Sequence, residues 1–144
     1  MINVLGGITA LILCLIAAIH AIWGLGFTWP EKDSRSLARR VAGFKGIQAM
    51  PSPAACFAVA TFLIFAAVLI VMAIGFIDPV LPMIALKLIL AGLAAGFCMR
   101  GLFSFLPFWR RLTPEQPFAR LDRHFYGPLC LCLALMLAGL VTQI

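Results

Sequence analysis

The chain has little charge, and acidic residues are especially few. It contains five Asp and Glu residues against eleven Lys and Arg residues, and charged residues make up only 11% of its 144 positions. Soluble domains carry about 25% charged residues and about 45–50% apolar ones, whereas this chain is 64% hydrophobic. The shortage of charge excludes a water-soluble fold, and the length predicts a single domain over residues 1–144.

The sequence also lacks the motifs of common enzyme classes. It contains no GxSxG, HExxH or CxxC pattern and no glycine-rich phosphate loop. The cysteines all fall in apolar stretches, which excludes a secreted disulfide framework; they are Cys14, Cys56, Cys98, Cys130 and Cys132. These absences favour a role other than catalysis.

Four apolar stretches are present, at about residues 4–27, 54–76, 82–103 and 126–141. Each is close to the ~20 residues that a helix needs to cross a bilayer. We therefore expect an all-α fold, a four-helix transmembrane bundle. The last stretch follows Gly127-Pro128, which we expect to open the fourth helix.

Lys and Arg residues gather in two of the connecting linkers. The first linker holds Lys32, Arg35, Arg39, Arg40 and Lys45, and the linker after the third stretch holds Arg110, Arg111, Arg120 and Arg123. The N-terminal tail, residues 75–81 and the C-terminal tail carry none. Short basic loops stay in the cytoplasm, so we expect both termini outside and two helical hairpins of parallel orientation.

These basic linkers also bear on partners. Juxtamembrane Lys and Arg residues contact anionic lipid head groups, so we expect membrane lipids as partners and no nucleic acid. In the third stretch Gly92 and Gly96 lie one turn apart, with Ala91 and Ala95 beside them. Such a GxxxG-like face lets two helix backbones approach closely. We expect it to pack inside the bundle, with a homodimer contact as the alternative.

The linkers contain weaker helix signals. Leu37, Val41 and Phe44 recur at helical spacing and predict a short surface helix capped by Asp33 or Ser34, with an irregular loop as the alternative. In the later linker, Thr113 followed by Pro114 predicts the start of a helical turn.

Ionisable groups within a membrane are costly and therefore mark candidate functional sites. His20 lies about eight residues, or ~12 Å, from the inner end of the first helix, with Trp23 on the same face. The other candidates close the third helix or open the fourth: Cys98, Arg100, Asp122, His124, Tyr126 and Cys130. All belong to the half that we expect to face the cytoplasm, which predicts a site opening on that side.

The leading hypothesis is that this half binds a lipid-like or hydrophobic ligand, or a membrane partner, without a cofactor. Its predicted site comprises His20, Trp23, Arg100, Asp122, Tyr126 and Cys130. One alternative is redox chemistry with haem on His20 and His124, or with Cu or Zn on His20 and Cys98 or Cys130. Another is a small transporter with Lys87 and His20 along its path. A purely structural role for His20, a hydrogen bond to the backbone of a neighbouring helix, also stays open.

Two segments resemble an uncharacterised bacterial family of small four-span membrane proteins that carry a domain of unknown function. They are His20–Gly24, with the sequence HAIWG, and Pro117–Cys130, with the sequence PFARLDRHFYGPLC. The resemblance implies a multi-pass protein of the bacterial cytoplasmic (inner) membrane and brings no activity. It draws attention to His20, Trp23, Arg120, Asp122, Tyr126, Pro128 and Cys130, whereas His124 is not part of that pattern.

Overall fold

The computed structural model describes residues 2–144, and these residues form helices and no β-strand. In chain order the elements are α1 (Ile2–Gly24), α2 (Ser34–Val41), α3 (Pro53–Ala73), α4 (Met83–Phe103), α5 (Pro107–Leu112), α6 (Phe118–Leu121), the π-helical turn η1 (Asp122–Tyr126) and α7 (Gly127–Val141). Four segments are long and apolar enough to cross a membrane, namely α1, α3, α4 and the continuous run Phe118–Val141. The all-α, four-helix prediction for a multi-pass membrane protein is confirmed.

The first three predicted spans agree with the structure within three residues at each end. The fourth agrees with α7, but the prediction missed the continuous helical run that extends back from α7 through η1 and α6. That helix begins at Phe118 and continues through Gly127 and Pro128. A proline has no N–H, and its ring collides with the carbonyl four residues earlier. The wider turn η1 precedes Pro128, and in it the Gly127 N–H donates to the Asp122 carbonyl, five residues back. The helix therefore accommodates Pro128 by a local change of pitch and does not begin there.

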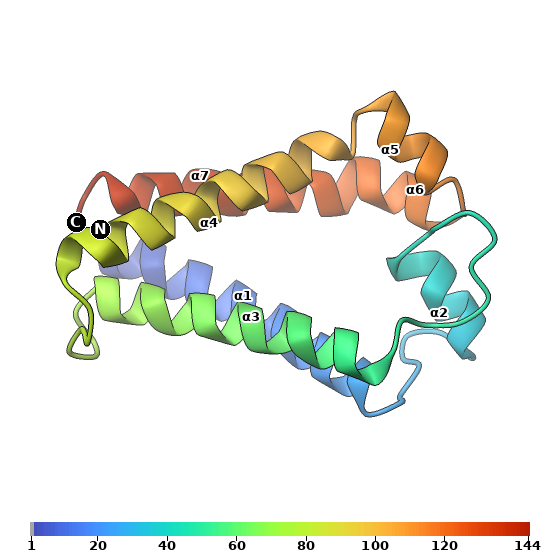
Figure 1. Cartoon of the computed structure of the whole chain (residues 1–144), viewed down its shortest axis with the longest axis horizontal. Coiled ribbons are helices and arrows are strands. Elements are labelled where there is room, and N and C mark those ends of the chain that lie inside the picture. The colour runs from blue at the N-terminus through green and yellow to red at the C-terminus, as the bar shows by residue number, and fades with distance from the viewer. Residues whose placement is uncertain (1) are drawn as a thin grey trace.

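The helices form two hairpins, α1 with α3 and α4 with α7 (Figure 1). Both basic linkers, residues 25–52 and 104–117, lie at one end of the bundle, which we call the linker end. The two termini and the turn between α3 and α4 lie at the other, the terminus end. The predicted pair of parallel hairpins is therefore confirmed.

The two hairpins converge at the terminus end and diverge toward the linker end (Figure 1). Near the terminus end the core contains fully buried side chains such as Ile70, Leu86 and Leu137. There α1 passes so close to α3 that a Cβ on Gly6 would lie 2.5 Å from Ile74 Cγ2.

Gly92 and Gly96 do not pack inside the bundle, so that prediction is wrong. A Cβ built on either residue has no other described atom within 4 Å beyond its own helix backbone. The reason is the rotation of α4, which buries Leu86, Leu90 and Ala94 toward the core and turns the glycine face outward. Contact with a second copy through this face stays a prediction.

The surface helix predicted in the first linker is confirmed as α2. Asp33 caps it, because its carboxylate accepts from the Ser36 N–H at 2.9 Å and from the Ser36 hydroxyl at 2.9 Å. These bonds lower the pKa of Asp33. Leu37 is buried as its spacing predicts, whereas Phe44 lies beyond the helix and is exposed.

The helical turn predicted to start at Thr113 is wrong. Thr113 instead follows the last residue of α5, and its hydroxyl donates to the Trp109 carbonyl at 2.9 Å. Pro107 occupies the first turn of α5, where its missing N–H costs nothing. Pro114 therefore starts no helical turn, and the next helix, α6, begins at Phe118.

Candidate functional site

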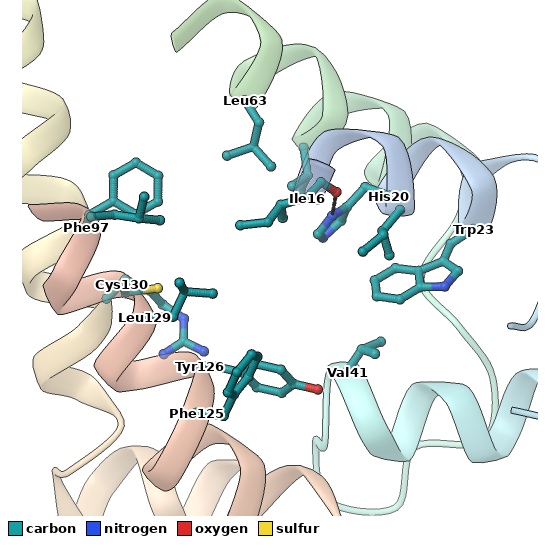
Figure 2. Close-up of a pocket in the computed structure, with 14 residues that line it drawn as sticks. Ile16, His20, Trp23, Val41, Leu63, Phe97, Phe125, Tyr126, Leu129 and Cys130 are labelled. Carbon is teal, nitrogen blue, oxygen red and sulfur yellow. Dashed lines mark hydrogen bonds between the residues drawn. The ribbon is translucent and has the colours of Figure 1, made fainter. Parts of the chain in front are cut away.

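A cavity of about 400 Å³ lies between the two hairpins, in the half of the bundle nearer the linkers (Figure 2). Side chains from α1, α2, α3, α4, η1 and α7 line it. They are Ile16, Ile19, His20, Trp23, Val41, Val59, Leu63, Phe97, Arg100, Phe125, Tyr126, Leu129, Cys130 and Leu133. Most of these side chains are apolar, so the few polar groups stand out.

The structure brings the six predicted site residues together. Five of them line the cavity: His20, Trp23, Arg100, Tyr126 and Cys130. The sixth, Asp122, lies behind Arg100 with only 2% of its surface exposed. Their binding of a ligand stays a prediction.

Arg100 and Asp122 form the polar edge of the cavity. Arg100 Nη2 lies 2.5 Å from Asp122 Oδ1, and Arg100 Nη1 donates to the Ser104 hydroxyl at 2.9 Å. Trp109 Nε1 donates to the other carboxylate oxygen, Asp122 Oδ2, at 2.9 Å. The Arg100 guanidinium carbon also lies 5.4 Å from the centre of the Trp109 ring, within cation–π range.

This arrangement buries the Asp122 carboxylate and leaves the Arg100 guanidinium partly exposed. The Arg100 side chain is 33% exposed, against 4% for the Asp122 side chain. Since both oxygens of Asp122 already accept hydrogen bonds, the carboxylate has its partners within the protein. The cavity therefore meets a guanidinium and no carboxylate.

His20 lies on the opposite wall, on α1 (Figure 2). Its Nδ1 lies 2.8 Å from the Ile16 carbonyl, an acceptor, so Nδ1 carries a proton in this contact. In the neutral ring that leaves Nε2 as an acceptor. The Trp23 ring lies 5.0 Å away, and its Nε1 donates to the Trp29 carbonyl at 2.8 Å. The structural role considered for His20 was a hydrogen bond to the backbone of a neighbouring helix, whereas the observed bond stays within α1.

Helix α2 closes the linker end of the cavity. Val41 lines the wall, and the Tyr126 hydroxyl donates to the Arg40 carbonyl at 3.3 Å, which joins the fourth span to α2. A second cavity of about 160 Å³ lies beside the first and shares His20, Trp23, Val41 and Val59 with it. His20 and Trp23 therefore stand between two adjoining spaces.

Glu115 connects the two basic linkers at the linker end of the bundle. Its carboxylate accepts from Arg39 Nε at 3.1 Å and from the Gly46 N–H at 3.1 Å. Its own N–H donates to the Gly43 carbonyl at 3.2 Å, and the Lys45 N–H donates to the Leu112 carbonyl at 3.1 Å. Together these bonds join both linkers into one cap.

Several residues singled out by the sequence lie elsewhere. His124 is exposed, with Nδ1 2.9 Å from the Arg120 carbonyl, and does not line the cavity that contains His20. Cys98 does not line it either. Within residues 2–144, no group of three or more His, Cys, Asp and Glu side chains is placed to hold a metal ion. Lys87 donates to the Ile144 carbonyl at 2.9 Å, at the terminus end.

Sequence reasoning missed two partners of the polar edge, Ser104 and Trp109. The Trp109 bond depends on how α5 folds back beside η1, and no local pattern in the sequence encodes that contact. It also missed the apolar walls, because one apolar face of a membrane helix looks like another. Spacing from Arg100 would have identified Ser104, four residues on and therefore on the same face.

Comparison with known families returns a match over most of the chain. The family model described as "Protein of unknown function (DUF3995)" matches residues 13–137. This range includes every residue that lines the larger cavity. No curated protein and no solved structure matches the chain.

Proposed function

Because the chain belongs to the DUF3995 family, whose function is unknown, we propose from its geometry that it binds a lipid-like amphipathic ligand between its two hairpins. The observation that carries this proposal is the cavity of about 400 Å³ with apolar walls and one polar edge. Ligand sites typically measure about 300–1,000 Å³ and combine apolar walls with a few placed polar groups. The cavity has both properties.

The polar groups suit an amphipathic ligand better than a wholly apolar one. Arg100 on α4 and His20 on α1 both line a space whose remaining walls are mostly Ile, Leu, Val and Phe side chains. The polar head of an amphipathic ligand would pair with Arg100 and His20, and its hydrocarbon tail would be buried against the apolar walls. The proposed role is binding, not catalysis.

The proposal includes a location, the bacterial cytoplasmic membrane, with the linker end inside. Of the eleven Lys and Arg residues, three form ion pairs and Lys87 lies at the terminus end. The other seven are exposed at the linker end: Lys32, Arg35, Lys45, Arg110, Arg111, Arg120 and Arg123. Such residues favour retention in the cytoplasm and contact with anionic lipids. Reporter fusions at Lys45 and Arg111 that report the periplasm would refute this orientation.

Filling the cavity tests the binding role. Leu129 lines the cavity, whereas Leu135 on the same helix is 74% exposed on the outer surface. We expect Leu129→Trp to occupy ligand volume and reduce co-purifying lipid severalfold, with Leu135→Trp retaining the wild-type amount. Native mass spectrometry of gently extracted protein measures the bound lipid. Equal retention in the two variants, or no retained lipid in the wild type, would contradict the proposal.

A further inference from the structure

The charge on the cavity wall is one-sided. Arg100 is the only Lys, Arg, Asp or Glu residue among the described residues that line it. The nearest carboxylate, Asp122, is held behind the guanidinium with both oxygens bonded to Arg100 and Trp109. A molecule in the cavity therefore meets positive charge first and negative charge only behind it.

Arg100 has hydrogen-bonding capacity left over. A guanidinium carries five N–H donors in a planar fork that matches a carboxylate or a phosphate. The described bonds of its side chain go to Ser104 and Asp122, from one nitrogen each. Its partial exposure leaves further donors toward the cavity. An anionic head group can accept two of these bonds side by side and adds the attraction of opposite charges, whereas a neutral head group offers hydrogen bonding alone.

The exposed cations around the linker end also favour an anionic ligand. The seven exposed cations that form no ion pair within the described chain surround the linker end, where the hairpins diverge. A surface of one sign raises the local concentration of ligands of the opposite sign. The cavity volume is near the lower limit for ligand sites, which suits one hydrocarbon chain rather than two.

We infer that the ligand is a single-chain lipid with an anionic head group, a phosphate monoester or a carboxylate, bound at Arg100. This inference rests on the proposed ligand-binding function and deepens it. Asp122 then acts as an internal competitor, since it shares the guanidinium with the ligand.

The test compares three lipids of identical acyl chain on the purified full-length protein in a neutral detergent. They are lysophosphatidic acid, which is anionic, lysophosphatidylcholine, which is zwitterionic, and monoacylglycerol, which is neutral. Monoacylglycerol lacks the anionic acceptor, and loss of one charge-assisted hydrogen-bonding partner weakens binding by about tenfold or more. Lysophosphatidylcholine keeps a phosphodiester, but its choline ammonium cancels the net charge and repels the Arg100 guanidinium. We therefore expect the wild type to bind the anionic lipid about tenfold more tightly than the other two.

Two variants and a control assign the preference to Arg100. The double variant Arg100→Gln/Asp122→Asn leaves the net charge unchanged, and we expect it to lose the preference while it still binds the neutral lipid. Asp122→Asn alone removes the competitor and should tighten binding of the anionic lipid severalfold. Arg111→Gln removes one of the seven exposed cations, which does not line the cavity, and should keep the tenfold preference for the anionic lipid.

The outcomes separate this inference from the proposal beneath it. If the wild type binds all three lipids equally, or the double variant keeps the preference, the anionic head group is refuted and the binding role survives. If none of the three lipids binds, the binding role fails as well. Excess inorganic phosphate should not displace the anionic lipid, because the acyl chain of the lipid supplies much of the binding free energy. Displacement by phosphate alone would refute a lipid-borne anion.

Discussion

Asp122 is the only buried Asp, Glu, Lys or Arg residue in the part of the chain that the structure describes. A charge taken out of water is costly unless it is paired and hydrogen-bonded. Asp122 meets both conditions through Arg100 and Trp109. The pair therefore serves the fold as well as the proposed site, and any variant has to separate these two roles.

Removing only one member of the pair should destabilise the protein. Arg100→Gln leaves the Asp122 carboxylate buried without its cation, which costs about 3–5 kcal/mol in comparable buried pairs. The double variant Arg100→Gln/Asp122→Asn removes both charges and should recover most of that loss. Thermal unfolding in detergent measures the difference. A double variant no more stable than Arg100→Gln would show that the ion pair does not explain the stability of this region.

At this scale the sequence predicts which residues are unusual and not what they touch. His20, Arg100 and Asp122 were identified as candidates because ionisable side chains are energetically costly inside a membrane. The bond between Trp109 and Asp122 depends on a contact between separate elements. The same limit applies to Arg120 and Arg123, which lie within two residues of Asp122 in the sequence but are exposed and outside the observed ion pairs.

Among the elements, the linkers depend most on a single backbone position. Gly43 has φ +63°, and its carbonyl accepts a hydrogen bond from the Glu115 N–H. The Glu115 carboxylate in turn accepts from the Gly46 N–H, so this backbone turn holds the two linkers together. A Cβ at Gly43 would lie 2.3 Å from the Phe118 ring, a contact that backbone and ring cannot both keep. Gly46 has a similar φ of +73° but open space around it.

These two glycines form a matched pair of variants. Gly46→Ala should cost about 1 kcal/mol, the usual penalty of a left-handed conformation for a residue with a side chain. Gly43→Ala should cost that amount and roughly 1–3 kcal/mol more for the collision with Phe118. Thermal unfolding of both variants under identical conditions measures the difference. Equal losses would show that Phe118 moves aside and that the cap is looser than the structure indicates.

Helix positions were predicted well because length and hydropathy fix them. Three spans agree with the expected ends, and α2 follows from its apolar spacing and its Asp33 cap. The errors fall at prolines. Gly127-Pro128 reads as a helix start because proline favours that position, yet the turn η1 lets the helix run through it. A local shift of the backbone hydrogen bonds from four to five residues back, as in η1, has no distinct sequence signature.

For the whole molecule, the decisive property is the way the two hairpins diverge (Figure 1). The charge pattern predicts that the basic linkers share one end, and the structure agrees. It cannot predict how each helix is rotated, because lipid-facing and core-facing side chains are both apolar. This is why the outward orientation of Gly92 and Gly96 and the position of the cavity required the structure.

Photolabelling with a lysophospholipid that carries a diazirine in its acyl chain tests the central claim most directly. Mass spectrometry of the digested protein identifies the labelled residues. We expect labelling of the cavity residues Leu63, Phe97 and Leu129 that unlabelled lysophosphatidic acid suppresses, and weaker, unsuppressed labelling of the outward-facing Leu88 and Leu135. Labelling confined to Leu88, Leu135 and their neighbours would show that lipid only surrounds the bundle and would contradict a binding site between the hairpins.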